Sequence, residues 1–421
     1  MTPPAAPLRV CIDARLEDGE PGGVQQTLVG LASGLSALGG AEEYLFLAHE
    51  GAESWLGPHL GGGCRLLPVA RGRPPRRRTG LRAALRRFDR NRRRLFLALA
   101  GRGLPPARLP ASDGTAEASG AEVMHFATQS GFRTALPSVY VPHDLQHLHL
   151  PELFSPEELA WREGFYRPLC EQARAVVALS RWGKEDLVRS FGLPPEKVRV
   201  IGWAPVLTAY PEPDAAALAA LRERHRLPAA FALYPAQTFP HKNHAGLLRA
   251  LAALRGRGLE VPLVLAGRRN DHWPVIEREL RRLGLGGQVR SLGYLPVADL
   301  HALYQLARLV VFPSRFEGFG MPVLEAFHAG TPLACSRATC LPDVAGGAAL
   351  LFDPEDPADV ARAVERLWND EALRRELAAR GRERVAGFSW ERVARRYRAL
   401  YRQVAGRPPG GEDAALLAEG P

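Results

Sequence analysis

The sequence has few of the residues that build disulfide-linked, zinc-stabilised or membrane-spanning proteins. Its 421 residues include 5 cysteines, an odd number, whose spacing matches no zinc-binding pattern. It has no uninterrupted apolar run of about 18 residues, which argues against a spanning helix. The N-terminus lacks the basic and then apolar segments of a signal peptide. We therefore expect a reduced, cytoplasmic protein.

Lysine is also scarce, since it occurs only at Lys184, Lys197 and Lys242. The net charge of +10 therefore comes almost entirely from arginine. Together with abundant Ala, Gly and Pro, this composition suggests a GC-rich, bacterial genome.

The positive charge is concentrated in one stretch. Residues 71–94 hold twelve arginines and one acid, Asp89, and Leu81, Leu85 and Phe88 recur there at roughly helical spacing. A basic amphipathic helix predicts peripheral contact with an anionic membrane at its inner face, or with a polyanion. A solvated insertion is the alternative. The lack of interleaved aromatics argues against nucleic acid.

The order of apolar and glycine-rich segments predicts an α/β protein with two domains. A chain of this length with 46% apolar residues can bury two cores. Residues 8–13 read as a buried strand, and a glycine loop with Gly22 and Gly23 leads into an amphipathic helix, which is typical of a doubly wound sheet. Residues 101–121 are rich in Pro, Ala, Gly and Ser and are predicted to form a mobile loop. A second alternation of strands and helices begins at Phe231, after a proline-rich linker at 203–213.

The most informative motif spans residues 310–326. An apolar strand leads into a loop in which Gly318 and Gly320 allow close backbone approach, and a helix follows. Glu317 lies in this loop, which we expect to be exposed, and Glu325 lies about one turn into the helix. A helix N-terminus favours phosphate. Two carboxylates beside it suit a ligand with hydroxyls and phosphates, such as a nucleotide sugar.

This motif resembles the two-glutamate signature of the retaining, GT-B-fold glycosyltransferases of family 4. The resemblance continues over most of the chain, through residues 142–147, 177–182, 234–243 and 388–392. It implies the GT-B fold, with two Rossmann-like, doubly wound domains facing a cleft.

The resemblance also implies a division of the chain. We expect an N-terminal acceptor domain at 1–205 and a C-terminal nucleotide-sugar donor domain at 206–388. A helix at 389–405 is expected to cross back to the N-terminal domain. Residues 406–421 are predicted to form a disordered tail, because prolines and glycines begin it.

By the same resemblance, three residues are predicted to act in catalysis. Glu317 would hold and orient the donor sugar, His143 would contact that sugar near the reaction centre, and Lys242 would bind the departing diphosphate. Glu325 would bind the nucleotide ribose. The other predicted donor-binding residues are Gly318, Phe319, Gly320, Gln237, Gly22, Gly23 and Arg268.

Two of these assignments leave alternatives open. The family usually has an arginine five residues before the lysine, where this chain has Gln237, so Arg268 or Arg269 is expected to supply the missing charge. Gly22 and Gly23 have a simpler explanation as turn residues. His147 and His149 lie near His143, but no ligand spacing supports a metal site, and no metal or other cofactor is expected.

The function predicted is retaining transfer of a hexose from a nucleotide-diphosphate sugar to a hydroxyl of a saccharide or lipid-linked acceptor, in bacterial polysaccharide biosynthesis. GDP-mannose is the donor that the resemblance favours. The alternative is a non-catalytic GT-B scaffold that binds a membrane or polyanion through residues 71–94. A third possibility keeps the fold but changes the reaction, for example to nucleotide-sugar epimerisation.

Overall fold

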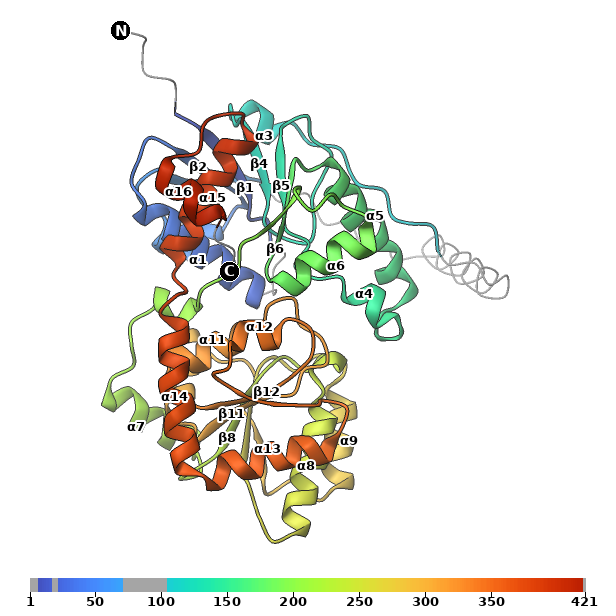
Figure 1. Cartoon of the computed structure of the whole chain (residues 1–421), viewed down its shortest axis with the longest axis vertical. Coiled ribbons are helices and arrows are strands. Elements are labelled where there is room, and N and C mark those ends of the chain that lie inside the picture. Colours follow the sequence, from blue (N-terminus) through green and yellow to red (C-terminus); the bar gives the residue numbers. More distant parts are fainter. Residues whose placement is uncertain (1–6, 17–21, 71–103, 419–421) are drawn as a thin grey trace. The chain divides into compact units, whose positions relative to one another are not determined.

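A computed structural model of the protein describes residues 7–16, 22–70 and 104–418. The Arg-rich stretch at 71–94 lies outside these residues, so its contact with a membrane stays a prediction. The chain folds into two compact units (Figure 1). Unit 1 comprises Met1–Ala178, Asp186–Arg199 and Ala394–Gly420, and unit 2 comprises Leu179–Glu185 and Val200–Val393.

Unit 1 is built on a seven-stranded sheet in the order β3-β2-β1-β4-β5-β6-β7. The neighbouring strands from β3 to β6 run parallel. The strands are β1 Arg9–Asp13, β2 Glu43–His49, β3 Cys64–Val69, β4 Val123–Phe126, β5 Ser138–Tyr140, β6 Ala175–Ala178 and β7 Val198–Val200. The strand order reverses between β1 and β4, which is where doubly wound sheets bind ligands.

The helices of unit 1 come from both ends of the chain. They are α1 Gly23–Ala37, α3 Thr115–Ala118, α4 Gln146–His149, α5 Pro156–Gln172, α6 Arg181–Phe191, α15 Trp390–Val404 and α16 Gly411–Ala418, of which α6 and α15 each have their first residues in unit 2. Helix α5 begins with a capping box, in which Glu158 N donates to Ser155 Oγ and Ser155 N donates to Glu158 Oε2.

Unit 2 has a six-stranded sheet in the order β10-β9-β8-β11-β12-β13, and every neighbouring pair is parallel. The strands are β8 Ala232–Pro235, β9 Leu263–Ala266, β10 Val289–Ser291, β11 Leu309–Phe312, β12 Leu333–Ser336 and β13 Leu350–Phe352. Strands β8, β9, β11 and β12 are buried throughout, which explains their continuous apolar sequences.

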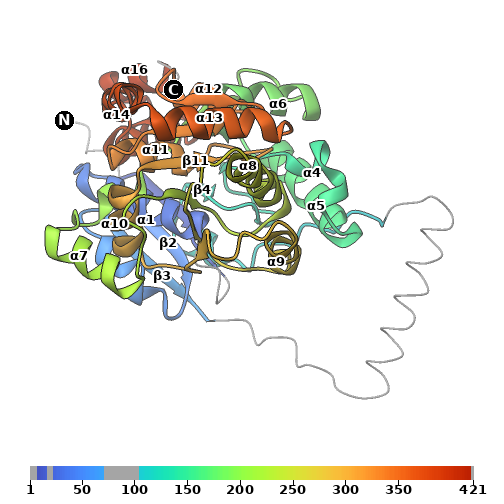
Figure 2. The ribbon, with the colours of Figure 1, turned by 90° about the horizontal axis from the view of Figure 1, so that it is seen from below.

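Helices cover both faces of this second sheet. They are α7 Ala215–Arg224, α8 His244–Gly256, α9 Trp273–Arg282, α10 Val297–Leu306, α11 Met321–His328, α12 Leu341–Ala345, α13 Pro357–Asn369 and α14 Glu371–Val385. Figure 2 shows α8 and α9 on one side of the sheet and α7 and α10 on the other. Among the described residues, none of the helices is both long and apolar enough to cross a bilayer.

The structure corrects two expectations about irregular segments. The predicted disordered tail at 406–421 contains helix α16, which is fastened to α15 because Arg395 and Arg398 both bind the buried carboxylate of Asp413. The Pro-rich segment before β4, predicted as mobile, is packed where it is described. Ala107 N donates to Ala160 O of α5 at 2.8 Å, and Leu109 is buried.

Candidate active site

The strand order of unit 2 reverses between β8 and β11, and the loops after these two strands carry most of the predicted donor-site residues. Residues 236–243 follow β8, and residues 313–320 follow β11. Ligands of doubly wound sheets bind beyond the carboxyl ends of the strands at such a reversal. The topology therefore brings together two loops that are more than 70 residues apart in the sequence, as the separation of Lys242 and Glu317 by 75 positions illustrates.

Lys242 and Glu317 form an ion pair at this point. Lys242 Nζ lies 2.6 Å from Glu317 Oε1, and the two side chains are only 17% and 11% exposed. The ammonium also lies 5.4 Å from the centre of the Phe312 ring, at the end of β11. The ammonium and the carboxylate are therefore both held in fixed positions, as a site for a diphosphate and a sugar requires.

The backbone before α8 fixes the position of Lys242. The hydroxyl of Tyr234, on β8, donates to the carbonyl oxygen of Lys242. Asn243 follows with a left-handed φ of 57°, its Oδ1 accepts from Gly246 N, and its Nδ2 donates to Pro354 O at 2.8 Å. Asparagine tolerates this conformation better than most residues, so the turn that presents Lys242 is encoded locally.

The backbone of Glu317 is clamped by one threonine. Glu317 N donates to Thr339 Oγ1 at 3.1 Å, and Thr339 Oγ1 donates to Glu317 O at 3.0 Å. Thr339 has a left-handed φ of 49°, which is a strained conformation for a β-branched residue. The expectation that Glu317 lies on an exposed loop was wrong. The ion pair holds its side chain, which is 11% exposed, and the clamp holds its backbone against other loops of unit 2.

The remaining residues of the motif shape the start of α11. Gly320 has a φ of 86°, and a Cβ atom there would lie 2.4 Å from Leu341 Cδ2, so only glycine fits. Gly320 offers no side-chain cap to the first N–H groups of α11, which suits a phosphate ligand. Phe319 is buried with its ring centre 5.7 Å from that of Trp203. Gly318 precedes it in the loop.

Glu325 lies on α11 and is 7% exposed. The hydroxyl of Tyr304, on α10, donates to Glu325 Oε2 at 2.7 Å. Burial raises the pKa of Glu325 to about 7, although the Tyr304 hydrogen bond lowers it. The sequence indicated Glu325 but not Tyr304, because no spacing rule links residues on two helices that meet only in the folded chain.

Gln237 and Arg268 lie in neighbouring loops of unit 2, after β8 and β9. A Cβ atom at Gly267 would lie 2.2 Å from Ala236 O, so glycine is required for the two loops to pass closely. Thr238 N donates to Arg268 O at 3.2 Å. Arg269 stacks on Trp273 at 4.2 Å and donates to Ser291. The Thr238 contact places the backbone of Arg268 beside the Gln237 loop, so Arg268 stays a candidate for the charge that Gln237 lacks.

His143 belongs to unit 1, after β5. Its φ is 67°, and its Nε2–H donates to Ala127 O at 2.9 Å. Burial lowers the pKa of His143 below its ordinary value, which favours the neutral ring. With the proton on Nε2, Nδ1 is an acceptor and not a donor.

Gly22 and Gly23 lie at the start of α1, also in unit 1. A Cβ atom at Gly23 would meet no atom within 4 Å, so packing gives no reason for glycine there. Their role beside a phosphate stays a prediction. Across the described ranges, no group of three or more His, Cys, Asp or Glu side chains is placed to hold a metal ion.

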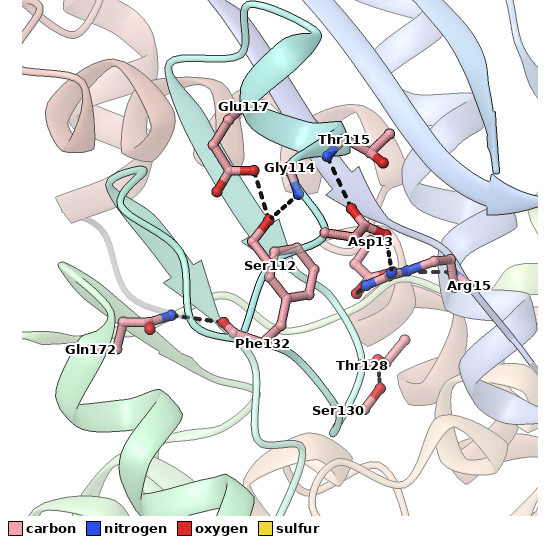
Figure 3. A network of polar contacts seen from close by, with 11 residues as sticks. Asp13, Arg15, Ser112, Gly114, Thr115, Glu117, Thr128, Ser130, Phe132 and Gln172 are labelled. Carbon is pink, nitrogen blue, oxygen red and sulfur yellow. Dashed lines mark hydrogen bonds and ion pairs between the residues drawn. The ribbon is translucent and has the colours of Figure 1, made fainter. Parts of the chain in front are cut away.

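A polar network at the strand reversal of unit 1 was missed by sequence analysis. Figure 3 shows Asp13, at the end of β1, bound by the side chain of Arg15 through two hydrogen bonds of 2.9 and 2.8 Å. The guanidinium also lies 4.9 Å from the centre of the Phe132 ring. The signal was an acid at the last position of the first strand and a base two residues later.

Two family descriptions match the sequence. Residues 21–202 match "Glycosyltransferase Family 4", and residues 221–384 match "Glycosyl transferases group 1". O-antigen chain mannosyltransferase B of Escherichia coli is 31% identical over 61% of this chain and 70% of its own length. The serotype-specific mannosyltransferase WbdA of the same organism is 35% identical, but the match covers only 32% of its length.

Solved structures share the fold at low identity. Sucrose-phosphate synthase from Thermosynechococcus elongatus aligns with a TM-score of 0.68 and 21% identity over 95% of this chain and 99% of its own. HepE of Anabaena, in complex with UDP and glucose, aligns with a TM-score of 0.67 and 19% identity over 93% and 98%. The sequence matches, the two parallel sheets and these neighbours agree, and the chain belongs to the group 1, family 4 glycosyltransferases, as a hexosyltransferase of the GT-B fold that acts in glycan biosynthesis.

Proposed function

We propose that the protein transfers mannose, with retention of anomeric configuration, from GDP-mannose to a hydroxyl of a saccharide or lipid-linked acceptor. The observation that carries the proposal is the Lys242–Glu317 pair at the strand reversal of unit 2, 2.6 Å apart. A cation for the diphosphate thus lies beside a carboxylate for sugar hydroxyls. The mannosyltransferases among its relatives support the choice of sugar.

The proposed reaction uses the leaving group as the base. The acceptor oxygen attacks the anomeric carbon as the bond from that carbon to the diphosphate breaks. The acceptor proton passes to the departing diphosphate oxygen on the same face of the sugar. Lys242 and the N-terminus of α11 stabilise the negative charge that grows there. Glu317 holds sugar hydroxyls, and the proposed steps use neither a protein nucleophile nor a metal ion.

Two features favour the alternative, a non-catalytic scaffold that binds a membrane or polyanion. Gln237 lacks the charge usual in the family, which lowers the charge stabilisation expected from this loop. The Arg-rich stretch at 71–94 predicts contact with anionic lipid, which a lipid-linked acceptor would require. Vesicle binding and donor turnover are separate measurements. A scaffold without activity would bind anionic vesicles without donor turnover, whereas an enzyme at a membrane would show both.

A donor panel tests the proposal. The full chain is incubated with GDP-mannose, UDP-glucose and UDP-N-acetylglucosamine, and the released nucleoside diphosphate is measured with and without mannosyl acceptors. We expect turnover with GDP-mannose and, by NMR, an axial product linkage as in the donor. Glu317→Ala should lower this turnover. Glu355→Ala is its control, because Glu355 pairs with the nearby Arg315 at 2.6 Å and has no proposed role. No release from any donor, or an inverted product, would refute the proposal.

A further inference from the structure

The hydrogen bond between Tyr304 and Glu325 joins two buried side chains on different helices. Tyr304 is fully buried on α10, Glu325 is 7% exposed on α11, and the phenol oxygen lies 2.7 Å from Glu325 Oε2. Among the ion pairs of the described ranges, none includes Glu325. The carboxylate thus depends on a neutral donor for the stabilisation of its charge.

Tyr304 is itself held in place and can act only as the donor. The hydroxyl of Thr331, which is buried, donates to Tyr304 O at 2.7 Å. Burial and the neighbouring Glu325 charge raise the pKa of Tyr304 far above its ordinary value, so its proton stays on the phenol oxygen. That proton points to Oε2, so this hydrogen bond engages Oε2 of the carboxylate and not Oε1.

We propose that Tyr304 is a positioning residue of the donor site, which fixes the Glu325 carboxylate so that it receives the ribose hydroxyls of a nucleoside diphosphate sugar. The inference rests on the proposed function. It adds a residue from α10, outside the glutamate motif, to the determinants of nucleotide affinity. It also predicts that this affinity depends on the protonation of a carboxyl group near neutral pH.

Other groups on the elements around α11 must be separated from this effect. They are Asp299 and His301 on α10, His328 on α11 itself, Cys335 on β12, Asp343 on α12, and Arg382 and Arg384 on α14. Burial lowers the pKa of both His301 and His328 below the ordinary histidine value, and burial raises that of the Cys335 thiol to about 12. The two histidines therefore titrate below, and the Cys335 thiol above, the pKa of about 7 that burial gives Glu325.

The test is the affinity of GDP between pH 5.5 and 9, by calorimetry, for the wild-type chain and Tyr304→Phe. Loss of the hydroxyl removes an interaction that lowers the Glu325 pKa, so more of the carboxyl is protonated near pH 7. A further rise of one pKa unit gives roughly fivefold weaker binding at pH 7 and approaches tenfold at lower pH. At pH 9 the loss should shrink, because the carboxyl is ionised in both proteins. The terminal phosphate of GDP titrates near pH 6 in both cases, so the ratio of affinities cancels it.

Matched variants separate this role from a structural one. Tyr401→Phe also removes a buried tyrosine hydrogen bond, that to His125 Nδ1 at 2.8 Å in unit 1, and should leave GDP affinity unchanged at every pH. In a Glu325→Gln chain, Tyr304→Phe should produce no pH-dependent change. If Tyr304→Phe fails to fold, Thr331→Val, which loosens Tyr304, should shift the profile in the same direction.

The outcomes distinguish the two proposals. A wild-type chain that binds no nucleoside diphosphate overturns the proposed function, and the inference with it. A wild-type chain that binds GDP, with a Tyr304→Phe ratio that is constant from pH 5.5 to 9, overturns the inference alone. A ratio that is greatest at the acid end of the range and falls toward one at pH 9 supports it.

Discussion

Glu325→Gln is expected to make the protein more stable above neutral pH. The pKa of Glu325 is about 7 in the folded chain, against an ordinary value of 4.5, because the group is buried. A carboxyl with a raised pKa opposes folding once it is ionised. The opposition begins as the pH rises past 4.5 and is complete above pH 7. A difference of about 2.5 units corresponds to about 3 kcal/mol.

Glutamine occupies the same space and still accepts the Tyr304 hydrogen bond, but it carries no charge. The gain in free energy of unfolding should therefore be up to about 3 kcal/mol at pH 8 and close to zero at pH 4. Urea denaturation at a series of pH values measures it. The units need not unfold together, so the transition that shifts identifies unit 2.

Glu279→Gln provides a control of opposite sign. Hydrogen bonds from Arg282 and Arg249, outweighing partial burial, lower the pKa of Glu279 to about 2. Its charge therefore stabilises the fold above pH 4.5, and that stabilisation is lost as the pH falls toward 2. Glu279→Gln should destabilise the protein at pH 8. A Glu325→Gln chain no more stable than the wild type at pH 8, beside a destabilised Glu279→Gln, would refute the reasoning about Glu325.

Three further predictions concern the loops around the ion pair. Thr339→Val should lower donor turnover at least tenfold and stability by about 1–2 kcal/mol, because Glu317 loses both of its hydrogen bonds to Thr339 Oγ1 and keeps only that from the Cys340 thiol to Glu317 O. Thr339→Ser should restore both, and unchanged kinetics in Thr339→Val would show that the clamp is not needed. Gln237→Arg should keep or tighten GDP binding by calorimetry, and weaker binding would place Gln237 in another role. Arg268→Ala should weaken GDP binding more than Arg269→Ala, since the backbone of Arg268 contacts the Gln237 loop through Thr238 N.

Much of the fold was predictable because its signals are local. Apolar runs mark strands of both sheets, and the Ser155-to-Glu158 spacing at the start of α5 is a capping-box pattern visible in the sequence. Strands β7 and β13 were not predicted; each lies at the edge of its sheet and is only partly buried, so neither needs a continuous apolar run. The tail was mispredicted because its helix depends on Asp413, whose arginine partners lie 15 and 18 residues earlier on α15.

The site was predictable only as a set of separate residues. The motif around Glu317 and the position of Lys242 are visible in the sequence, but their contact follows from the reversal of strand order between β8 and β11. The Thr339 clamp and the Tyr304 hydrogen bond are tertiary contacts without a sequence period. Burial of Glu325, which sets its pKa, is likewise a property of the packed helices.

The most direct test of the donor site compares Lys242→Ala and Glu317→Ala in two assays. Lys242→Ala should weaken GDP binding tenfold or more, with Lys197→Ala, a lysine bonded to Glu171 O, as the control. Glu317→Ala should keep or tighten GDP binding, since Lys242 loses its partner, yet lower turnover roughly a hundredfold or more. Equal GDP affinity in wild type and Lys242→Ala, or wild-type turnover in a folded Glu317→Ala chain, would contradict the account.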